Sequence, residues 1–139
     1  MKKLTTAAAA AFALLLAGFP ATAHHSGAAY FDLQSTIEHT GATVVSYDLV
    51  NPHGRLVYTI IDENGNEVEW SGELASANNL RRRGLGGEIF SPGDQLASVV
   101  GNPALSGANF SRLTRVVFAN GDVAQLTGPN TGLTRAGSR

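Results

Sequence analysis

The sequence predicts a mainly β protein: a small OB-like barrel of five to six strands, with one short helix between the third and fourth strands. Three observations support this prediction. β-Branched and aromatic residues gather in short segments between glycine-containing turns. Only one segment after residue 35 has helical spacing. Three strands in a meander, a helix and a closing hairpin follow the chain order of an OB barrel, with a sandwich that lacks the helix as the alternative.

The first two strands are separated by a turn that contains proline. Residues 37–50 are rich in β-branched side chains, and Gly41 within them indicates a bulge or a bend. The residues Asn51-Pro52-His53-Gly54 then interrupt the strand as a turn. Residues 56–61 are apolar on both faces, which favours a central strand.

The third strand follows a hairpin signal, Asp62-Glu63-Asn64-Gly65. Residues 67–74 alternate between apolar or small and polar side chains, as a half-buried strand does. The expected inward positions are Val68, Trp70, Gly72 and Leu74. The expected outward positions include three glutamates that we interpret as solubility charges, Glu67, Glu69 and Glu73.

The helix is predicted over residues 77–83. Ser76 is a suitable N-cap, and Gly84 ends the helical spacing. The remaining strands are expected at residues 95–100, at residues 113–119 and, as a short strand, up to residue 126. Barrel closure needs local bends, which we assign to Gly41 and Gly72.

The first 23 residues have the three-part pattern of a secretory signal peptide. A positive start, Met1-Lys2-Lys3, precedes an apolar stretch from Leu4 to Phe19 and a small-residue cleavage site, Ala21-Thr22-Ala23. The apolar stretch is short for a membrane anchor, so we expect no membrane span after cleavage. Cleavage after Ala23 predicts a periplasmic or secreted bacterial protein whose first residue is His24.

The predicted organisation of the chain has four parts. They are the signal peptide at residues 1–23, an extended N-terminal arm at residues 24–35, the OB-like barrel at residues 36–126 and a flexible tail at residues 127–139. The tail is expected to be loose because it lacks an apolar period.

Composition and charge exclude several functions. The chain has no cysteine, which removes disulfides and thiolate metal sites. Both lysines lie in the signal peptide, so processing leaves 8 basic against 11 acidic residues. A mildly acidic chain is a poor candidate for nucleic acid. No nucleophile elbow, phosphate loop or spaced metalloprotease motif occurs, so we predict no catalytic residues and favour a binding protein over an enzyme.

The histidines are the candidate site residues. Imidazole binds copper, zinc and nickel, and a histidine at the very N-terminus adds its α-amine as a second nitrogen ligand. This arrangement resembles the histidine brace of secreted copper proteins. The predicted metal ligands are His24 and His53, with His25 as the competitor for the second position and Asp32 as a possible oxygen ligand. His39, inside the first strand, is expected to be structural.

Several motifs together resemble an uncharacterised family of small secreted bacterial proteins, a domain of unknown function. The motifs are His24-His25-Ser26, Tyr30-Phe31-Asp32, Gly41-Ala42-Thr43-Val44, Asn51-Pro52-His53, Pro92-Gly93-Asp94, Gly101-Asn102-Pro103 and Asn120-Gly121-Asp122, with Trp70, Leu80 and Gly84 between them. The family usually has tryptophan where this chain has Leu49 and Leu85. The resemblance covers the chain to about residue 126 and implies export but no activity.

These observations lead to one functional hypothesis and its alternative. We expect an exported binding protein without catalysis that binds a transition metal, copper first and zinc second, through His24 and His53. The alternative is an envelope adaptor that binds a protein partner or a small ligand and needs no metal. A shared fold does not decide between them.

Overall fold

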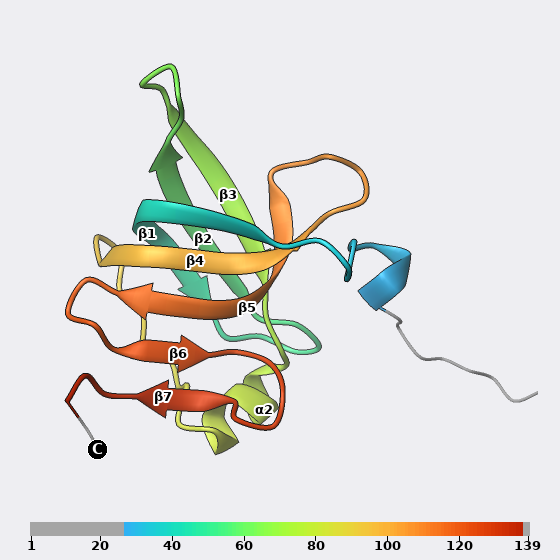
Figure 1. The fold of residues 1–139 in the computed structure, drawn as a ribbon. Coiled ribbons are helices and arrows are strands. Elements are labelled where there is room, and N and C mark those ends of the chain that lie inside the picture. The colour runs from blue at the N-terminus through green and yellow to red at the C-terminus, as the bar shows by residue number, and fades with distance from the viewer. Residues whose placement is uncertain (1–26, 138–139) are drawn as a thin grey trace, which may run out of the picture.

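The computed structural model describes residues 27–137. Its elements, in chain order, are the 3-10 helix η1 (Gly27–Ala29), β1 (Ile37–Asp48), β2 (Arg55–Ile61), β3 (Glu67–Glu73), α2 (Ala77–Arg82), β4 (Gln95–Pro103), β5 (Phe110–Phe118), β6 (Val123–Gln125) and β7 (Gly132–Thr134). One sheet holds all the strands in the order β3-β2-β1-β4-β5-β6-β7 (Figure 1). No helix within residues 27–137 is long and apolar enough to cross a bilayer.

A closed barrel forms because β3 also pairs with β5. This pairing is parallel and joins Ser71 to Phe110 and Glu73 to Arg112. The first five strands therefore close in the order β1-β2-β3-β5-β4, which confirms the OB-like barrel with one short helix between its third and fourth strands. β6 and β7 extend the sheet beyond β5 (Figure 1).

The long strand β1 belongs to two pairings. Its first half pairs with β4, and its second half pairs with β2. Gly41 has a positive φ of 65°, which departs from extended strand backbone, and the bulge in the pairing with β2 lies between Val44 and Ser46. A strand that serves two neighbours must curve, and both irregularities supply that curvature.

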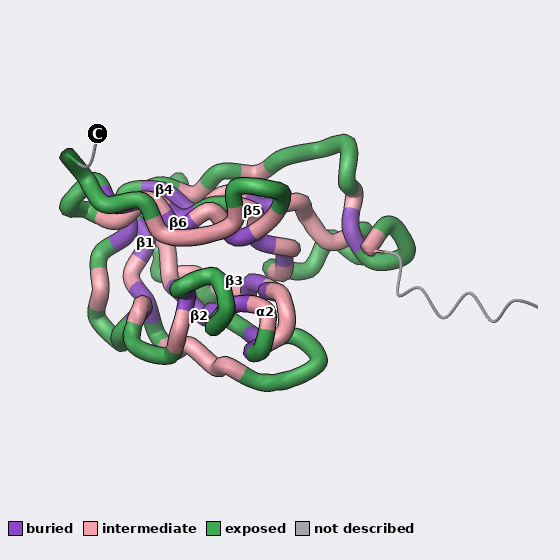
Figure 2. Tube along the Cα trace, turned by 90° about the horizontal axis from the view of Figure 1, so that it is seen from below, coloured by how far each residue is buried: buried purple, intermediate pink, exposed green. Residues whose placement is uncertain are grey.

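The barrel interior is the hydrophobic core. Buried positions lie along the strands and in α2, and the outer loops are exposed (Figure 2). The helix forms as expected: the Ser76 side chain accepts a hydrogen bond from the Asn79 backbone, and Gly84 follows with a φ of 75°. Leu80, fully buried, attaches α2 to the core. The core side chains with the least exposure include Ala42, Leu56, Tyr58, Leu80, Leu85, Leu96, Leu113 and Val116.

The structure differs from the sequence-based expectation at four places. β4 continues to Pro103 instead of ending at residue 100, and β5 begins at Phe110. Residues 127–137, for which a loose tail was expected, contain β7, which pairs with β6. The described part of the arm holds η1 and the buried Phe31, where an extended segment was expected. In each case tertiary pairing orders residues that have no strong local signal.

The arm, residues 27–35 in the structure, lies against the segment that joins β4 to β5. Phe31 is 2% exposed, bridges to Ala104, and places its ring 5.3 Å from that of Phe110. Leu105 donates a backbone hydrogen bond to Tyr30, and Asp32 donates one to Pro103. The start of the described chain is therefore held against the outside of the barrel.

Candidate functional site

His53 lies in the connection between β1 and β2, beside the end of β3. The turn is fixed by Gly54, which donates a backbone hydrogen bond to Ala75 and accepts one from Leu74. His53 Nδ1 is 3.3 Å from Glu73 Oε1, and the two side chains are 47% and 27% exposed. The imidazole is accessible, and the carboxylate holds its orientation.

A hollow of about 230 Å³ opens where this turn meets β3 and β5. It is lined by His53, Glu73, Leu74, Ala75, Arg112, Leu113 and Thr127. Glu73 and Arg112 are partners in the parallel pairing of β3 and β5, which brings their side chains to the same side of the sheet. The hollow therefore combines an imidazole, a carboxylate and a guanidinium.

The arm begins next to this hollow. A Cβ atom built on Gly27 would lie 3.7 Å from Cδ and 3.9 Å from Nε of Arg112. Gly27 is the first residue that the structure describes. The chain that precedes it therefore enters the described fold beside the hollow that His53 lines.

A second hollow, of about 320 Å³, lies between the arm and the segment joining β4 to β5. Its lining is mostly apolar: Ala29, Tyr30, Phe31, Glu73, Ala104, Leu105, Ser106 and Phe110. Glu73 lines both hollows. We call the two together the arm cleft.

The predicted metal ligands have different positions. His53 lines the arm cleft, whereas His24 and His25 lie outside the described residues. Asp32 lines neither hollow. Its carboxylate accepts hydrogen bonds from the Ser35 hydroxyl and the Gln34 backbone, and these bonds lower its pKa. Within residues 27–137, no three histidine or acidic side chains form a group that could hold a metal.

Sequence reasoning missed the two charged residues of the cleft. Glu73 was interpreted as a solubility charge, and Arg112 was not singled out. The alternation of β3 correctly predicts that Glu73 points outward. It carries no signal that His53 and the arm approach that outer face, because these contacts depend on the pairing of β3 with β5.

Trp70 is part of the barrel and not of the cleft. It packs against the core, and its ring centroid lies 4.2 Å from that of His39. His39 Nδ1 forms a 3.0 Å hydrogen bond with Tyr58 Oη, and burial lowers the pKa of His39. These contacts agree with the structural role expected for His39 and with the core position expected for Trp70.

The lowered pKa of His39 predicts a pH dependence of stability. As pH falls below the ordinary value of 6.5, the unfolded chain takes up a proton at His39 before the folded chain does, so stability falls toward pH 5. His39→Gln removes this group and is expected to flatten the decline. The free energy of unfolding is measured at each pH by urea unfolding, followed by the fluorescence of Trp70, the one tryptophan. If the stability of the native chain and that of His39→Gln fell equally with pH, the prediction would be contradicted.

The fold and the cleft define a class: a small OB-like β-barrel with an N-terminal arm that forms a cleft on its outer surface. Comparison with protein families matches residues 11–112 to a family of unknown function, DUF6152. The match spans more than half of the chain, so the protein belongs to this family. Comparison with curated proteins and with solved structures gave no significant match.

Proposed function

We propose that this protein is an exported binding protein that holds one transition-metal ion, copper first, in the arm cleft. The ligands are the α-amine and imidazole of His24 and the imidazole of His53. One observation carries the proposal: His53 is accessible in a hollow against which Gly27, the start of the described arm, also lies.

The contact with Glu73 prepares His53 as a ligand. When Nδ1 donates its proton to the Glu73 carboxylate, the lone pair of Nε2 is available to a metal. A carboxylate behind a ligating imidazole fixes the ring and makes it more basic. Glu73 is thus a positioning residue for the metal ligand.

The chain length allows His24 to reach the same place. His24 lies three positions before Gly27, and three residues span at most about 10 Å. With His53, the amine and ring of His24 supply three nitrogen ligands. Nitrogen sites bind copper(II) more strongly than the other divalent metals of its row, which is why copper comes before zinc. His25 is the competitor for the second imidazole position.

The test is calorimetric titration of the processed protein with Cu(II) and then Zn(II), after mass spectrometry confirms His24 as the first residue. We expect one-to-one binding and a higher affinity for Cu(II). His53→Ala should weaken binding at least about tenfold, and Glu73→Gln about 10–100-fold. Glu69→Gln is the matched control, because Glu69 is an exposed outward residue on the same strand.

A methionine placed before His24 removes the terminal chelate without altering the barrel. Tight Cu(II) binding should then be lost. Affinity that neither this extension nor His53→Ala changes would overturn the proposal. If His25→Ala abolished Cu(II) binding and His53→Ala had no effect, the second imidazole ligand would be His25 instead.

The alternative function is an envelope adaptor that uses no metal. The observation that favours it is the exposure of Tyr30 and Leu105, 65% and 61%, beside the arm cleft. For such an adaptor, a chelator would leave partner binding unchanged, and the variants of His24 and His53 would bind as the native chain does.

A further inference from the structure

Arg112 is a partly buried cation that has no acceptor among residues 27–137. Within residues 27–137, its guanidinium takes part in no hydrogen bond or ion pair. The side chain lines the hollow of about 230 Å³, and its Cδ and Nε lie beside Gly27. A guanidinium that has lost part of its hydration gains from an anionic acceptor, and its planar donors suit a carboxylate.

Glu73, the acidic neighbour of Arg112 on β3, forms no ion pair with it. Glu73 is its partner in the β3–β5 pairing, yet the only ion-pair contact of Glu73 among the described residues is with His53. The donors of Arg112 therefore remain available to a molecule that enters the cleft.

The other half of the cleft offers an apolar surface. Tyr30 and Leu105 are largely exposed there, and the paired rings of Phe31 and Phe110 form part of its lining. Phe110 and Arg112 are two residues apart on β5, so their side chains leave the strand on the same face. An apolar surface next to one fixed polar group is the usual composition of a small-molecule site.

We propose that the arm cleft binds a small ligand consisting of a carboxylate group on an apolar body. The carboxylate pairs with Arg112, and the apolar body lies against Tyr30 and Leu105. The hollows of about 320 and 230 Å³ match a molecule of this size. This site is independent of the metal, because it requires neither His24 nor His53.

The experiment uses 3-phenylpropanoate as the probe and the processed protein freed of metal. Binding is followed by NMR titration of backbone amides, with 3-phenylpropanamide as the uncharged probe of the same shape. We expect saturable binding of the carboxylate, with shifts at Tyr30, Leu105 and Arg112, and much weaker binding of the amide. Arg112→Gln should weaken carboxylate binding about tenfold or more.

Two variants complete the design. Arg115→Gln, at an exposed position of the same strand, is the matched control and should bind the probe unchanged. Leu105→Ser, at a largely exposed position, should weaken binding of the probe without unfolding the chain. Equal affinity for the carboxylate and the amide, no saturation at millimolar concentrations, or unchanged binding by Arg112→Gln would each overturn the proposal.

The methionine extension before His24 separates this proposal from the metal site. The extended protein lacks the terminal chelate but should bind 3-phenylpropanoate as the native chain does. Failure of the carboxylate site would leave metal binding unaffected, and failure of the metal site would leave probe binding unaffected.

Discussion

Replacing Gly72 by alanine is expected to lower the free energy of unfolding by about 2–3 kcal/mol, because the added methyl group has no room. A Cβ atom at this position would lie 2.3 Å from Cδ1 and 2.4 Å from Cγ of Leu113. Leu113 is buried in the core, and Gly72 pairs with Ser111 where β3 meets β5. The methyl group would therefore push apart the two strands that close the barrel.

Urea unfolding followed by circular dichroism measures this loss. Gly86→Ala is the control, since a Cβ at Gly86 would meet no atom within 4 Å, and its stability should stay near that of the native chain. The double variant Gly72→Ala with Leu113→Ala tests the mechanism, because a smaller partner should make the alanine at position 72 less costly. If Gly72→Ala were as stable as the native chain, the close approach of Leu113 to Gly72 would be refuted.

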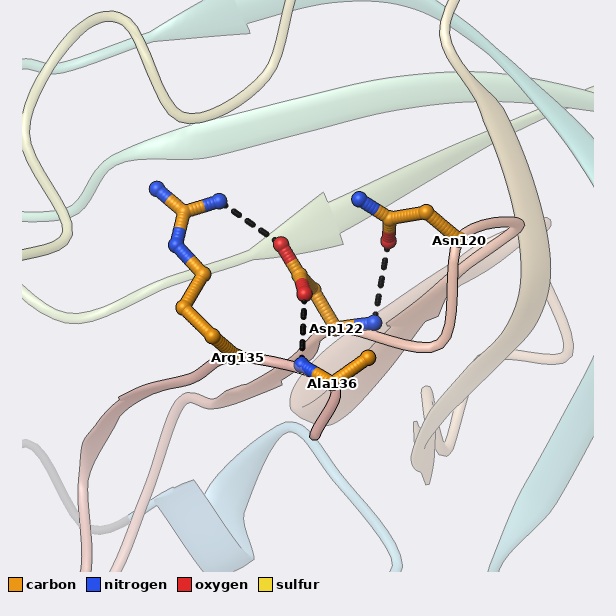
Figure 3. A network of polar contacts seen from close by, with 4 residues as sticks. All are labelled: Asn120, Asp122, Arg135 and Ala136. Carbon is orange, nitrogen blue, oxygen red and sulfur yellow. Dashed lines mark hydrogen bonds and ion pairs between the residues drawn. The ribbon is translucent and has the colours of Figure 1, made fainter. Parts of the chain in front are cut away.

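Asp122→Ala is expected to release β7 from the barrel. The Asp122 carboxylate is buried and accepts hydrogen bonds of 2.6 Å from Arg135 Nη1 and 2.8 Å from the Ala136 backbone, and Asn120 accepts one from the Asp122 backbone (Figure 3). The bonds from Ala136 and Arg135 lower the pKa of this carboxyl. Their stabilisation is therefore present above pH 3.8 and is lost as pH falls through the lowered pKa.

Hydrogen exchange of the β7 amides reports this release. We expect exchange in Gly132–Thr134 to rise about tenfold or more in Asp122→Ala, with little change in β2. Asp122→Asn, which keeps one acceptor oxygen but loses the charge, should give an intermediate effect. Arg135→Ala should have the smaller effect, because its side chain is 69% exposed and the backbone bond from Ala136 remains. Native protection in Asp122→Ala would show that pairing with β6 alone holds β7.

Much of the fold was predictable because its signals are local. The turn after β2 is held by Asp62, whose carboxylate accepts hydrogen bonds from the backbones of Asn64 and Asn66. Ser76 and Gly84 delimit α2 through contacts within a few residues. Alternation predicted the inward face of β3, including the buried Gly72. These features can be predicted from the sequence because the residues that interact are close together along the chain.

The missed elements depend on distant partners. Residues 101–103 have the composition of a turn, yet they extend β4 because Gly101 pairs with Ile37 and Leu113. Residues 132–134 form β7 because β6 and Asp122 hold this part of the chain. Gly72 was expected to provide a bend, but the structure assigns it a different role, the close approach of Leu113. None of these contacts has a periodic signature.

The candidate site, like the fold, was predictable only in its local features. The sequence by itself determined the type of side chain available, the histidines and no cysteine, and the outward direction of Glu73 on its strand. Only the tertiary structure decided that His53, Glu73 and Arg112 share one hollow and that the arm begins beside it. The physical reason is that the parallel pairing of β3 with β5 closes the barrel, and closure brings together side chains that no local pattern connects.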